Sequence, residues 1–164
     1  SVASRGLGDV YKRQGWSWAI VTVLLPYLCL VWQNKVATLP KIIFYGVFFH
    51  TFLFCSINAI IFDLKDYEED AHVQLQTFVV KYGYLQTLSR VILPLLIIDS
   101  VLVGSFSVLE KFSILQTLIL QIPILLMTVL VFVLRKQKSL LFFLVIVDGV
   151  LFLKAIIGIL VSNV

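Results

Sequence analysis

Charged side chains are scarce in this chain. Asp, Glu, Lys and Arg make up 13% of its 164 residues, whereas 60% of the residues are hydrophobic. A soluble domain of this size does not need so much apolar surface, so the composition excludes an ordinary soluble domain. The net charge of +4 comes without any face rich in Lys and Arg, which argues against a nucleic-acid partner. The basic residues are better explained as loop residues that face a membrane surface.

Other common features are also missing. The apolar stretches lack the alternation of apolar and polar residues that marks β-strands, which argues against a membrane β-barrel. Cys29 and Cys55, the two cysteines, lie within apolar segments without metal-ligand spacing, so we expect ordinary packed or lipid-facing side chains. Residues 1–14 lack the apolar core of a signal peptide. We expect them to be a non-native or unstructured leader before a membrane-embedded domain in residues 15–164.

Long apolar runs dominate the rest of the chain. About 20 apolar residues cross the roughly 30 Å hydrocarbon core of a bilayer. Five runs qualify, at about 15–32, 42–62, 88–109, 114–134 and 140–161. The predicted fold is therefore all-α, a polytopic helical membrane protein with five transmembrane helices in this chain.

Basic residues are unevenly divided between the two sides of these runs. One side carries Lys65, Lys81, Arg90, Arg135, Lys136 and Lys138, and the other carries Lys35, Lys41 and Lys111. The positive-inside rule places the first side, with the loop after the second run, in the cytoplasm. We expect a multi-pass protein of the cytoplasmic membrane, with membrane lipid around it.

An acidic cluster follows the second run directly. It holds five of the nine acidic residues of the chain: Asp63, Asp66, Glu68, Glu69 and Asp70. If the helix continues, Asp63, Asp66 and Asp70 fall within an arc of roughly 60° on one face. Carboxylates at such short distances repel each other, and a bound hard cation such as Mg²⁺ would keep them ionised. These three aspartates are the predicted metal ligands, although a solvated loop is the alternative.

Two further residues of this segment are candidates for binding a substrate. Lys65 is embedded among the acids and can contact a phosphate oxygen directly. Asn58, near the end of the second run, can hydrogen-bond into the same cavity. With a bridging Mg²⁺, the cluster would hold a diphosphate instead of repelling it.

Ionisable residues flanked by apolar ones include His50, Asp99, Asp148 and Lys154. Asp99, Asp148 and Lys154 would each cost roughly 2.5 to 3.5 kcal/mol when ionised at mid-membrane, so we expect them to face the bundle interior, a partner or a headgroup. Lys154 paired with Asp99 or Asp148 is the simplest arrangement. A structural lock between helices is the first interpretation, and substrate binding is the alternative. His50 is expected to be a hydrogen-bonded packing residue, not a ligand.

The segment 62–83, FDLKDYEEDAHVQLQTFVVKYG, resembles the second Asp-rich motif of the UbiA superfamily of intramembrane prenyltransferases. Its matches to the family pattern are Asp66 and Asp70 for the D-x-x-x-D pair, Thr77 for the threonine and Gly83 for the final glycine. Gln74 and Gln76 stand where the family commonly has Gly and a basic residue. The resemblance implies a nine-helix bundle with this motif between the sixth and seventh helices. Three runs follow the motif here, as that topology requires.

The resemblance also implies an activity. A UbiA-type prenyltransferase moves an isoprenyl group from an isoprenyl diphosphate to a small lipophilic, often aromatic acceptor and depends on Mg²⁺. Asp66 and Asp70 would be the catalytic metal ligands, with Asp63 a third ligand or a group behind the ligands and Lys65 a phosphate contact. The first Asp-rich motif of the family has no counterpart in these 164 residues. We therefore expect the chain to be the C-terminal part of the enzyme and inactive alone.

Two other interpretations remain. CDP-alcohol phosphotransferases need D-G followed shortly by A-R, but VLFLKA follows Asp148 and Gly149. The non-enzymatic alternative is a membrane scaffold or transporter fragment whose acidic cytoplasmic loop binds cations. Mg²⁺ binding that depends on isoprenyl diphosphate would separate the enzyme from the scaffold.

Overall fold

The computed structural model describes residues 17, 20–32, 41–72, 74, 77–136 and 138–161, and all regular structure in them is helical. Within these residues, four helices are long and apolar enough to cross a membrane: Ile43–Lys65, Tyr84–Leu109, Ile114–Val133 and Phe143–Val161. They confirm four of the five predicted runs. Of the run at 15–32, the described part is a π-helical turn, η1 (Ile20–Leu24), and α2 (Leu25–Trp32). A fifth span stays a prediction, and the predicted leader lies outside the described residues.

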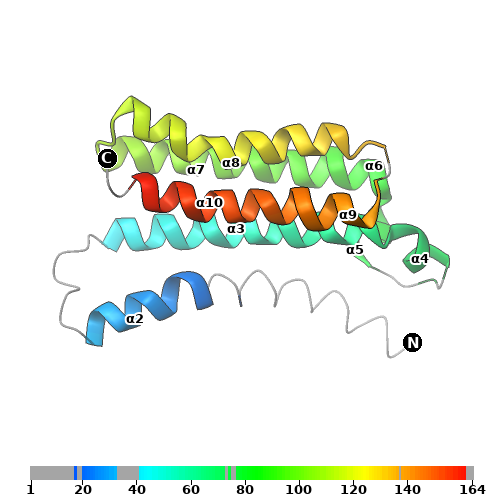
Figure 1. The fold of residues 1–164 in the computed structure, drawn as a ribbon, viewed down its shortest axis with the longest axis horizontal. Helices are drawn as coiled ribbons and strands as arrows, with labels where there is room; N and C mark the ends of the chain where they lie inside the picture. The colour runs from blue at the N-terminus through cyan, green and yellow to red at the C-terminus, as the bar shows by residue number, and fades with distance from the viewer. Residues whose placement is uncertain are drawn as a thin grey trace.

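The four long helices form an antiparallel bundle (Figure 1). The first is α3 (Lys41–Lys65), and the second joins α6 (Tyr84–Thr87), the π-helical turn η3 (Leu88–Ile92) and α7 (Leu93–Leu109). The third is α8 (Ile114–Val133), and the fourth joins α9 (Leu140–Phe142), η4 (Phe143–Val147) and α10 (Asp148–Val161). Contacts link α3 to α7, α7 to α8, α8 to α10 and η4 back to α3.

The two ends of the bundle differ. At one end, here called the acidic end, α4 (Tyr67–His72) follows α3 and projects beyond the long helices (Figure 1). At the other, the far end, α7 turns directly into α8. Lys111 takes a left-handed φ of 56° there, and Phe112 N donates to Ser107 O at 2.9 Å, which closes the C-terminus of α7. Ser113 then starts α8 with a capping box to Gln116.

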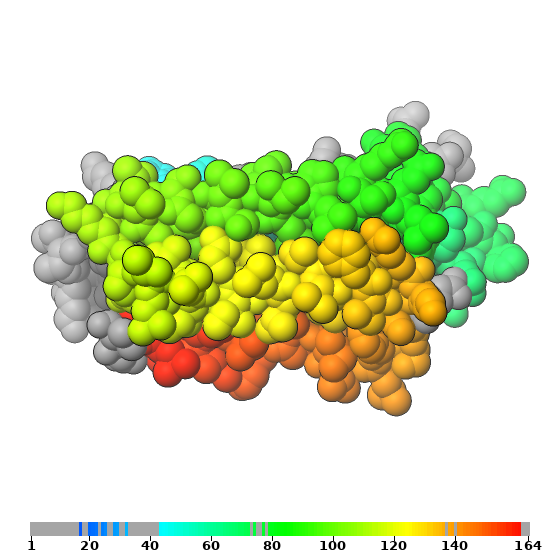
Figure 2. All heavy atoms as spheres, turned by 90° about the horizontal axis from the view of Figure 1, so that it is seen from above, coloured from blue at the N-terminus to red at the C-terminus, as the bar shows by residue number. Residues whose placement is uncertain are grey.

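Apolar side chains fill the bundle and also cover its outside. The largest fully buried side chains include Phe54, Ile57, Ile61, Leu88, Ile92, Leu96, Met127, Leu134 and Phe143. Figure 2 shows the face of the bundle on which α8 lies between α7 and α10. Large apolar side chains are exposed on both α7 and α8, among them Ile97, Val101, Leu125 and Val129. An apolar exterior of this extent suits contact with lipid.

Gly46 on α3 faces the Phe106 ring of α7 at close range. A Cβ added at Gly46 would lie 2.5 Å from the Phe106 ring, so any larger residue displaces that ring. Cys55 is buried in the bundle, Cys29 is exposed, and both are free cysteines.

Candidate functional site

The acidic segment begins inside the last turn of α3 and is interrupted once. Asp63 belongs to α3 and is buried. Asp66 forms a turn between α3 and α4, and Asp70 N donates to Asp66 O at 2.9 Å within the new helix. Lys65 Nζ lies 3.3 Å from Asp66 Oδ1, and this carboxylate is about half exposed. The helix is therefore interrupted between Asp63 and Asp70. The prediction that Asp63, Asp66 and Asp70 share one helix face assumed a continuous helix.

The three predicted metal ligands are not grouped in this structure. Asp63 is buried in α3, Asp66 pairs with a lysine, and Asp70 lies on α4. Within the described ranges, no group of three His, Cys, Asp or Glu side chains is arranged to hold a metal ion. Carboxylates are suitable Mg²⁺ ligands, but their placement here does not fit a three-carboxylate site, and the magnesium site stays a prediction.

A small pocket beside the acidic segment carries two lysines. Its volume is about 110 Å³, and its lining consists of Leu64, Lys65, Glu68, Tyr84, Lys138 and Phe143. The pocket therefore has room for several waters or for an anionic group. Lys138 enters from the segment between α8 and α9, and its Nζ lies 5.7 Å from the centroid of the Phe142 ring. The fold thus places a second cation in the same pocket as Lys65, and we call this pocket the lysine pocket.

The other residues of the motif have clear backbone roles. Thr77 caps α5 (Phe78–Tyr82), because its Oγ1 accepts a hydrogen bond from Val80 N at 3.3 Å. Gly83 ends that helix with φ 85°, a conformation that favours glycine. Gln74 also has a positive φ, 56°, at the position where the family pattern has glycine. Gln76 lies outside the described residues.

Asn58 lies on α3 between the acidic end and the middle of the bundle. It is buried, and its Oδ1 makes no hydrogen bond to any described residue. A buried amide oxygen without a donor costs about 1–3 kcal/mol, so this atom is ready to accept a hydrogen bond. The predicted polar contact of Asn58 is compatible with this position.

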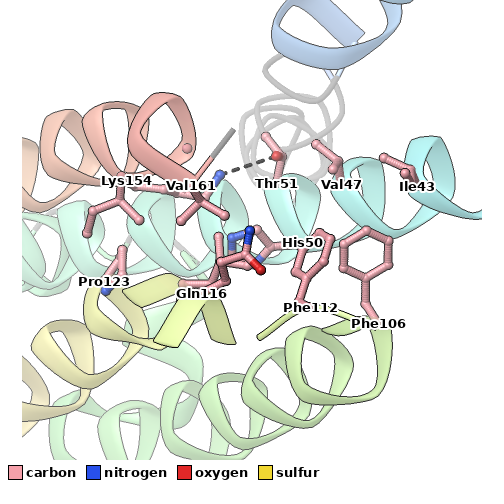
Figure 3. Close-up of a pocket in the computed structure, with 13 residues that line it drawn as sticks. Ile43, Val47, His50, Thr51, Phe106, Phe112, Gln116, Pro123, Lys154 and Val161 are labelled. Atoms are coloured by element: carbon pink, nitrogen blue, oxygen red, sulfur yellow. Dashed lines mark hydrogen bonds between the residues drawn. The ribbon is translucent and has the colours of Figure 1, made fainter. Parts of the chain in front are cut away.

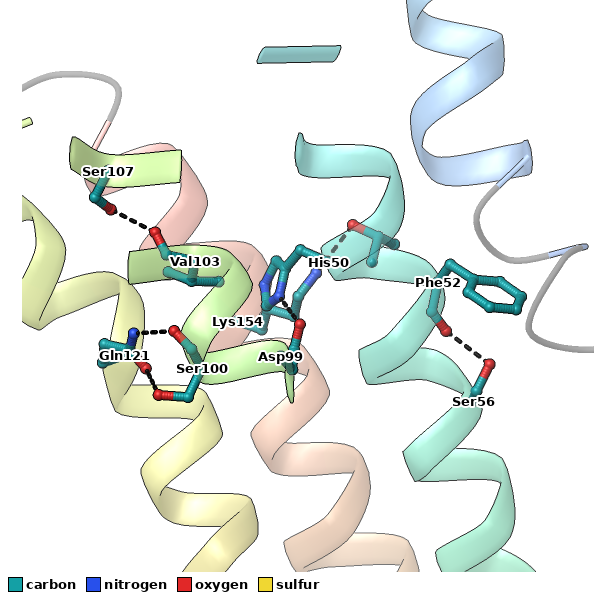
Figure 4. Close-up of polar contacts among 10 residues, drawn as sticks. His50, Phe52, Ser56, Asp99, Ser100, Val103, Ser107, Gln121 and Lys154 are labelled. Carbon is teal, nitrogen blue, oxygen red and sulfur yellow. Dashed lines mark hydrogen bonds and ion pairs between the residues drawn. The ribbon is translucent and has the colours of Figure 1, made fainter. Parts of the chain in front are cut away.

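A second set of polar side chains lies in the middle of the bundle (Figure 4). Asp99 on α7 is fully buried, and its Oδ1 lies 2.8 Å from Nδ1 of His50 on α3. Lys154 on α10 donates from Nζ to Thr51 Oγ1 at 3.2 Å. We call these four residues the buried polar cluster. His50 is hydrogen-bonded, as expected, and Asp99 faces the interior, as expected.

The expected pairing of Lys154 with an aspartate is wrong. Asp99 bonds to His50 instead, and Lys154 bonds to a hydroxyl. Asp148 is exposed at the start of α10 and does not face the interior. The reason is rotational: Asp148 and Lys154 are six residues apart and therefore lie on different faces of one helix.

Sequence reasoning missed three contributors. Lys138 counted only toward the orientation of the chain, and Thr51 and Tyr84 were not considered. Tyr84 lines the lysine pocket, and its hydroxyl donates to Leu134 O at 2.7 Å. An aromatic with a polar tip at a helix end is a weak signal, and no local pattern identifies the partner 50 residues away.

Comparison with known proteins gives no relative. The chain matches no family model, and neither the curated proteins nor the solved structures include a match.

Proposed function

We propose that this chain is part of a UbiA-type intramembrane prenyltransferase. The observation that carries the proposal is the position of the Asp-rich segment: it lies at the end of a membrane-length helix, beside two lysines, with three membrane-length helices after it. That order is the one the family resemblance implies. In the proposal the first predicted run is a fifth span, and four further helices complete the nine-helix bundle.

The backbone at Gln74 supports the match independently of the aspartates. Non-glycine residues rarely adopt a positive φ, yet Gln74 has φ 56° where the family pattern carries glycine. Gly83, at the glycine that ends the motif, also has a positive φ. Two positions of the pattern therefore have the backbone conformation that glycine favours.

The lysine pocket contributes two positive charges to the proposed site, beside the carboxylate of Glu68 that also lines it. When the C–O bond of an isoprenyl diphosphate breaks, its electron pair stays on the diphosphate oxygen and an allylic cation remains. Lys65 and Lys138 line one pocket and can stabilise this negative charge. The apolar bundle keeps water from the cation. Mg²⁺ ligation by Asp66 and Asp70 as catalytic ligands, with Asp63 as the third, stays a prediction of the resemblance, because these carboxylates are not grouped in this structure, and no step here is assigned to the metal.

In this proposal the acidic end faces the cytoplasm, where phosphorylated metabolites are available. More basic residues lie near the acidic end than near the far end, which is the observation that supports this orientation. The acceptor is a small lipophilic or aromatic molecule.

Binding of farnesyl thiolodiphosphate, which resists ionisation, tests the site in the chain as it stands. We expect Lys65→Gln and Lys138→Gln each to weaken binding about tenfold, because each removes a charge-assisted contact to phosphate. Lys111→Gln removes an equal charge at the far end and should change nothing. Equal affinity for farnesol would show that the diphosphate is not recognised and would favour the scaffold with a cation-binding acidic loop.

Turnover tests the aspartates. In the nine-helix enzyme of this proposal, Asp66→Ala or Asp70→Ala should abolish prenyl transfer without unfolding the protein. Activity retained in both variants would overturn the assignment, and far-UV circular dichroism checks the fold of each.

A further inference from the structure

The far half of the bundle contains a cavity that the prenyltransferase proposal does not use. Its volume is about 510 Å³, within the range of cavities that bind small organic molecules. Helices α3, α7, α8 and α10 and the turn between α7 and α8 line this partly open cavity. Its lining is Ile43, Val47, His50, Thr51, Phe106, Phe112, Gln116, Leu120, Pro123, Lys154, Ile157, Gly158 and Val161. The acidic segment and the lysine pocket contribute none of these residues.

The lining divides into an apolar wall and a polar patch. Ile43, Val47 and Thr51 follow one another along α3, and Lys154 reaches across from α10 to Thr51 (Figure 3). Phe106 and Phe112 form an edge-to-face pair with centroids 5.5 Å apart and close the cavity toward the far end. A ligand in this space would therefore place an apolar body against aliphatic and aromatic side chains and a polar group against Lys154.

The charges of the polar patch define the polar group. Lys154 and His50 can both carry a positive charge, whereas Asp99, behind His50, is the single carboxylate in the buried polar cluster. Lys154 Nζ has one hydroxyl partner at 3.2 Å and lies 5.3 Å from the centroid of the Phe54 ring, which leaves donor capacity on its ammonium group. One anionic oxygen group beside Lys154 would balance the second cation and accept hydrogen bonds from Lys154 and Thr51.

We propose that this cavity binds an organic monoanion, such as a carboxylate with a compact apolar body. The anion pairs with Lys154 and Thr51, and the apolar body lies between α3, α10 and the two phenylalanines. This site is separate from the proposed diphosphate site and stands or falls independently of it. A free acid and an anionic lipid headgroup share this chemistry.

Glycines on α10 provide a way to fill the cavity without removing a charge. Gly158 lines the cavity and is exposed, and a Cβ added there meets no atom within 4 Å, so a leucine fits at the wall of the cavity without displacing a neighbour. Gly149 lies on the same helix, is equally open around its Cβ and does not line the cavity. Gly158→Leu and Gly149→Leu are therefore a matched pair of blocking and control variants.

Radiolabelled decanoate, bound to the purified chain in a scintillation proximity assay, tests the proposal. We expect saturable binding that unlabelled decanoate displaces and that decanol, with the same tail and no charge, does not. Lys154→Met keeps the side-chain length and should weaken binding at least about tenfold. Lys111→Gln, an equal loss of charge on the exposed far-end turn, should leave binding unchanged.

The cavity variants keep the test decisive if Lys154→Met fails to fold. Gly158→Leu should abolish decanoate binding, and Gly149→Leu should retain it, with helix content checked for both. Nanodiscs with and without phosphatidylglycerol separate the two sources: binding lost only in the anionic bilayer assigns the site to a lipid headgroup, and binding kept in both assigns it to a free acid. Absence of saturable binding, equal displacement by decanol, or unchanged binding in Gly158→Leu would overturn the proposal.

Discussion

The contact between Asp99 and His50 offers the sharpest test of how the bundle is held together. Asp99 is fully buried, its Oδ1 lies 2.8 Å from His50 Nδ1, and its Oδ2 accepts no hydrogen bond from any described residue. Removing one partner of a buried ion pair costs about 3–5 kcal/mol. A neutral hydrogen bond between membrane helices contributes only about 0.6 kcal/mol on average and about 1.7 at most. The coupling energy between Asp99 and His50, measured with the two single variants and the double variant, therefore shows whether the pair is ionic.

We expect Asp99→Leu to lower the free energy of unfolding by about 3 kcal/mol, because it removes the single carboxylate beside His50 and Lys154. His50→Leu should cost about 2 kcal/mol, since Lys154 still offsets part of the charge of Asp99. The double variant should cost about the same as Asp99→Leu alone, which is a coupling energy of about 2 kcal/mol.

Reversible unfolding in mixed detergent and dodecyl sulfate micelles, followed by far-UV circular dichroism, measures these energies. Ser100 and Gln121 provide a neutral comparison: Ser100 Oγ donates to Gln121 Oε1 at 3.0 Å between α7 and α8. Their coupling should stay near 0.6 kcal/mol. A His50–Asp99 coupling no larger than that of the neutral pair would refute the ionic interpretation and with it the charge balance argued for the cavity.

Three further changes test local features of the fold. Gly46→Ala should lower the free energy of unfolding by about 1–3 kcal/mol, because its Cβ would meet the Phe106 ring at 2.5 Å. Gly104→Ala, with open space around its Cβ, should be neutral or stabilising. Equal effects of the two variants in the same unfolding assay would contradict the close packing at Gly46. Gln74→Gly should raise the free energy of unfolding by about 1 kcal/mol, because glycine adopts the positive φ of this position without strain. The unfolding midpoint should therefore rise. A lower midpoint would show that residue 74 does not have a positive φ. Tyr84→Phe should cost about 1 kcal/mol through the lost hydrogen bond to a helix-end carbonyl, and no change would mean that water replaces the hydroxyl.

The candidate site was only partly accessible from the sequence. The positions of Asp63, Asp66 and Asp70 at the end of a helix follow from the apolar run before them, because charge ends a membrane-length helix. Whether these side chains converge depends on the backbone at Asp66, where the helix breaks. A one-residue break in a helix changes the direction in which the following side chains point around the helix axis, and no local sequence pattern predicts this change.

The sequence by itself determined the helices. Apolar runs of about 20 residues have one stable form in lipid, since a helix satisfies its own backbone hydrogen bonds, and four of the five predicted runs are long helices in the structure. Only the tertiary structure decided which polar groups meet. His50 and Asp99 are 49 residues apart, Thr51 and Lys154 are 103 apart, and the rotation of each packed helix sets these contacts. Each charged side chain could have paired with any of several polar residues on other helices. The way in which the apolar helix faces pack decided which of them it contacts.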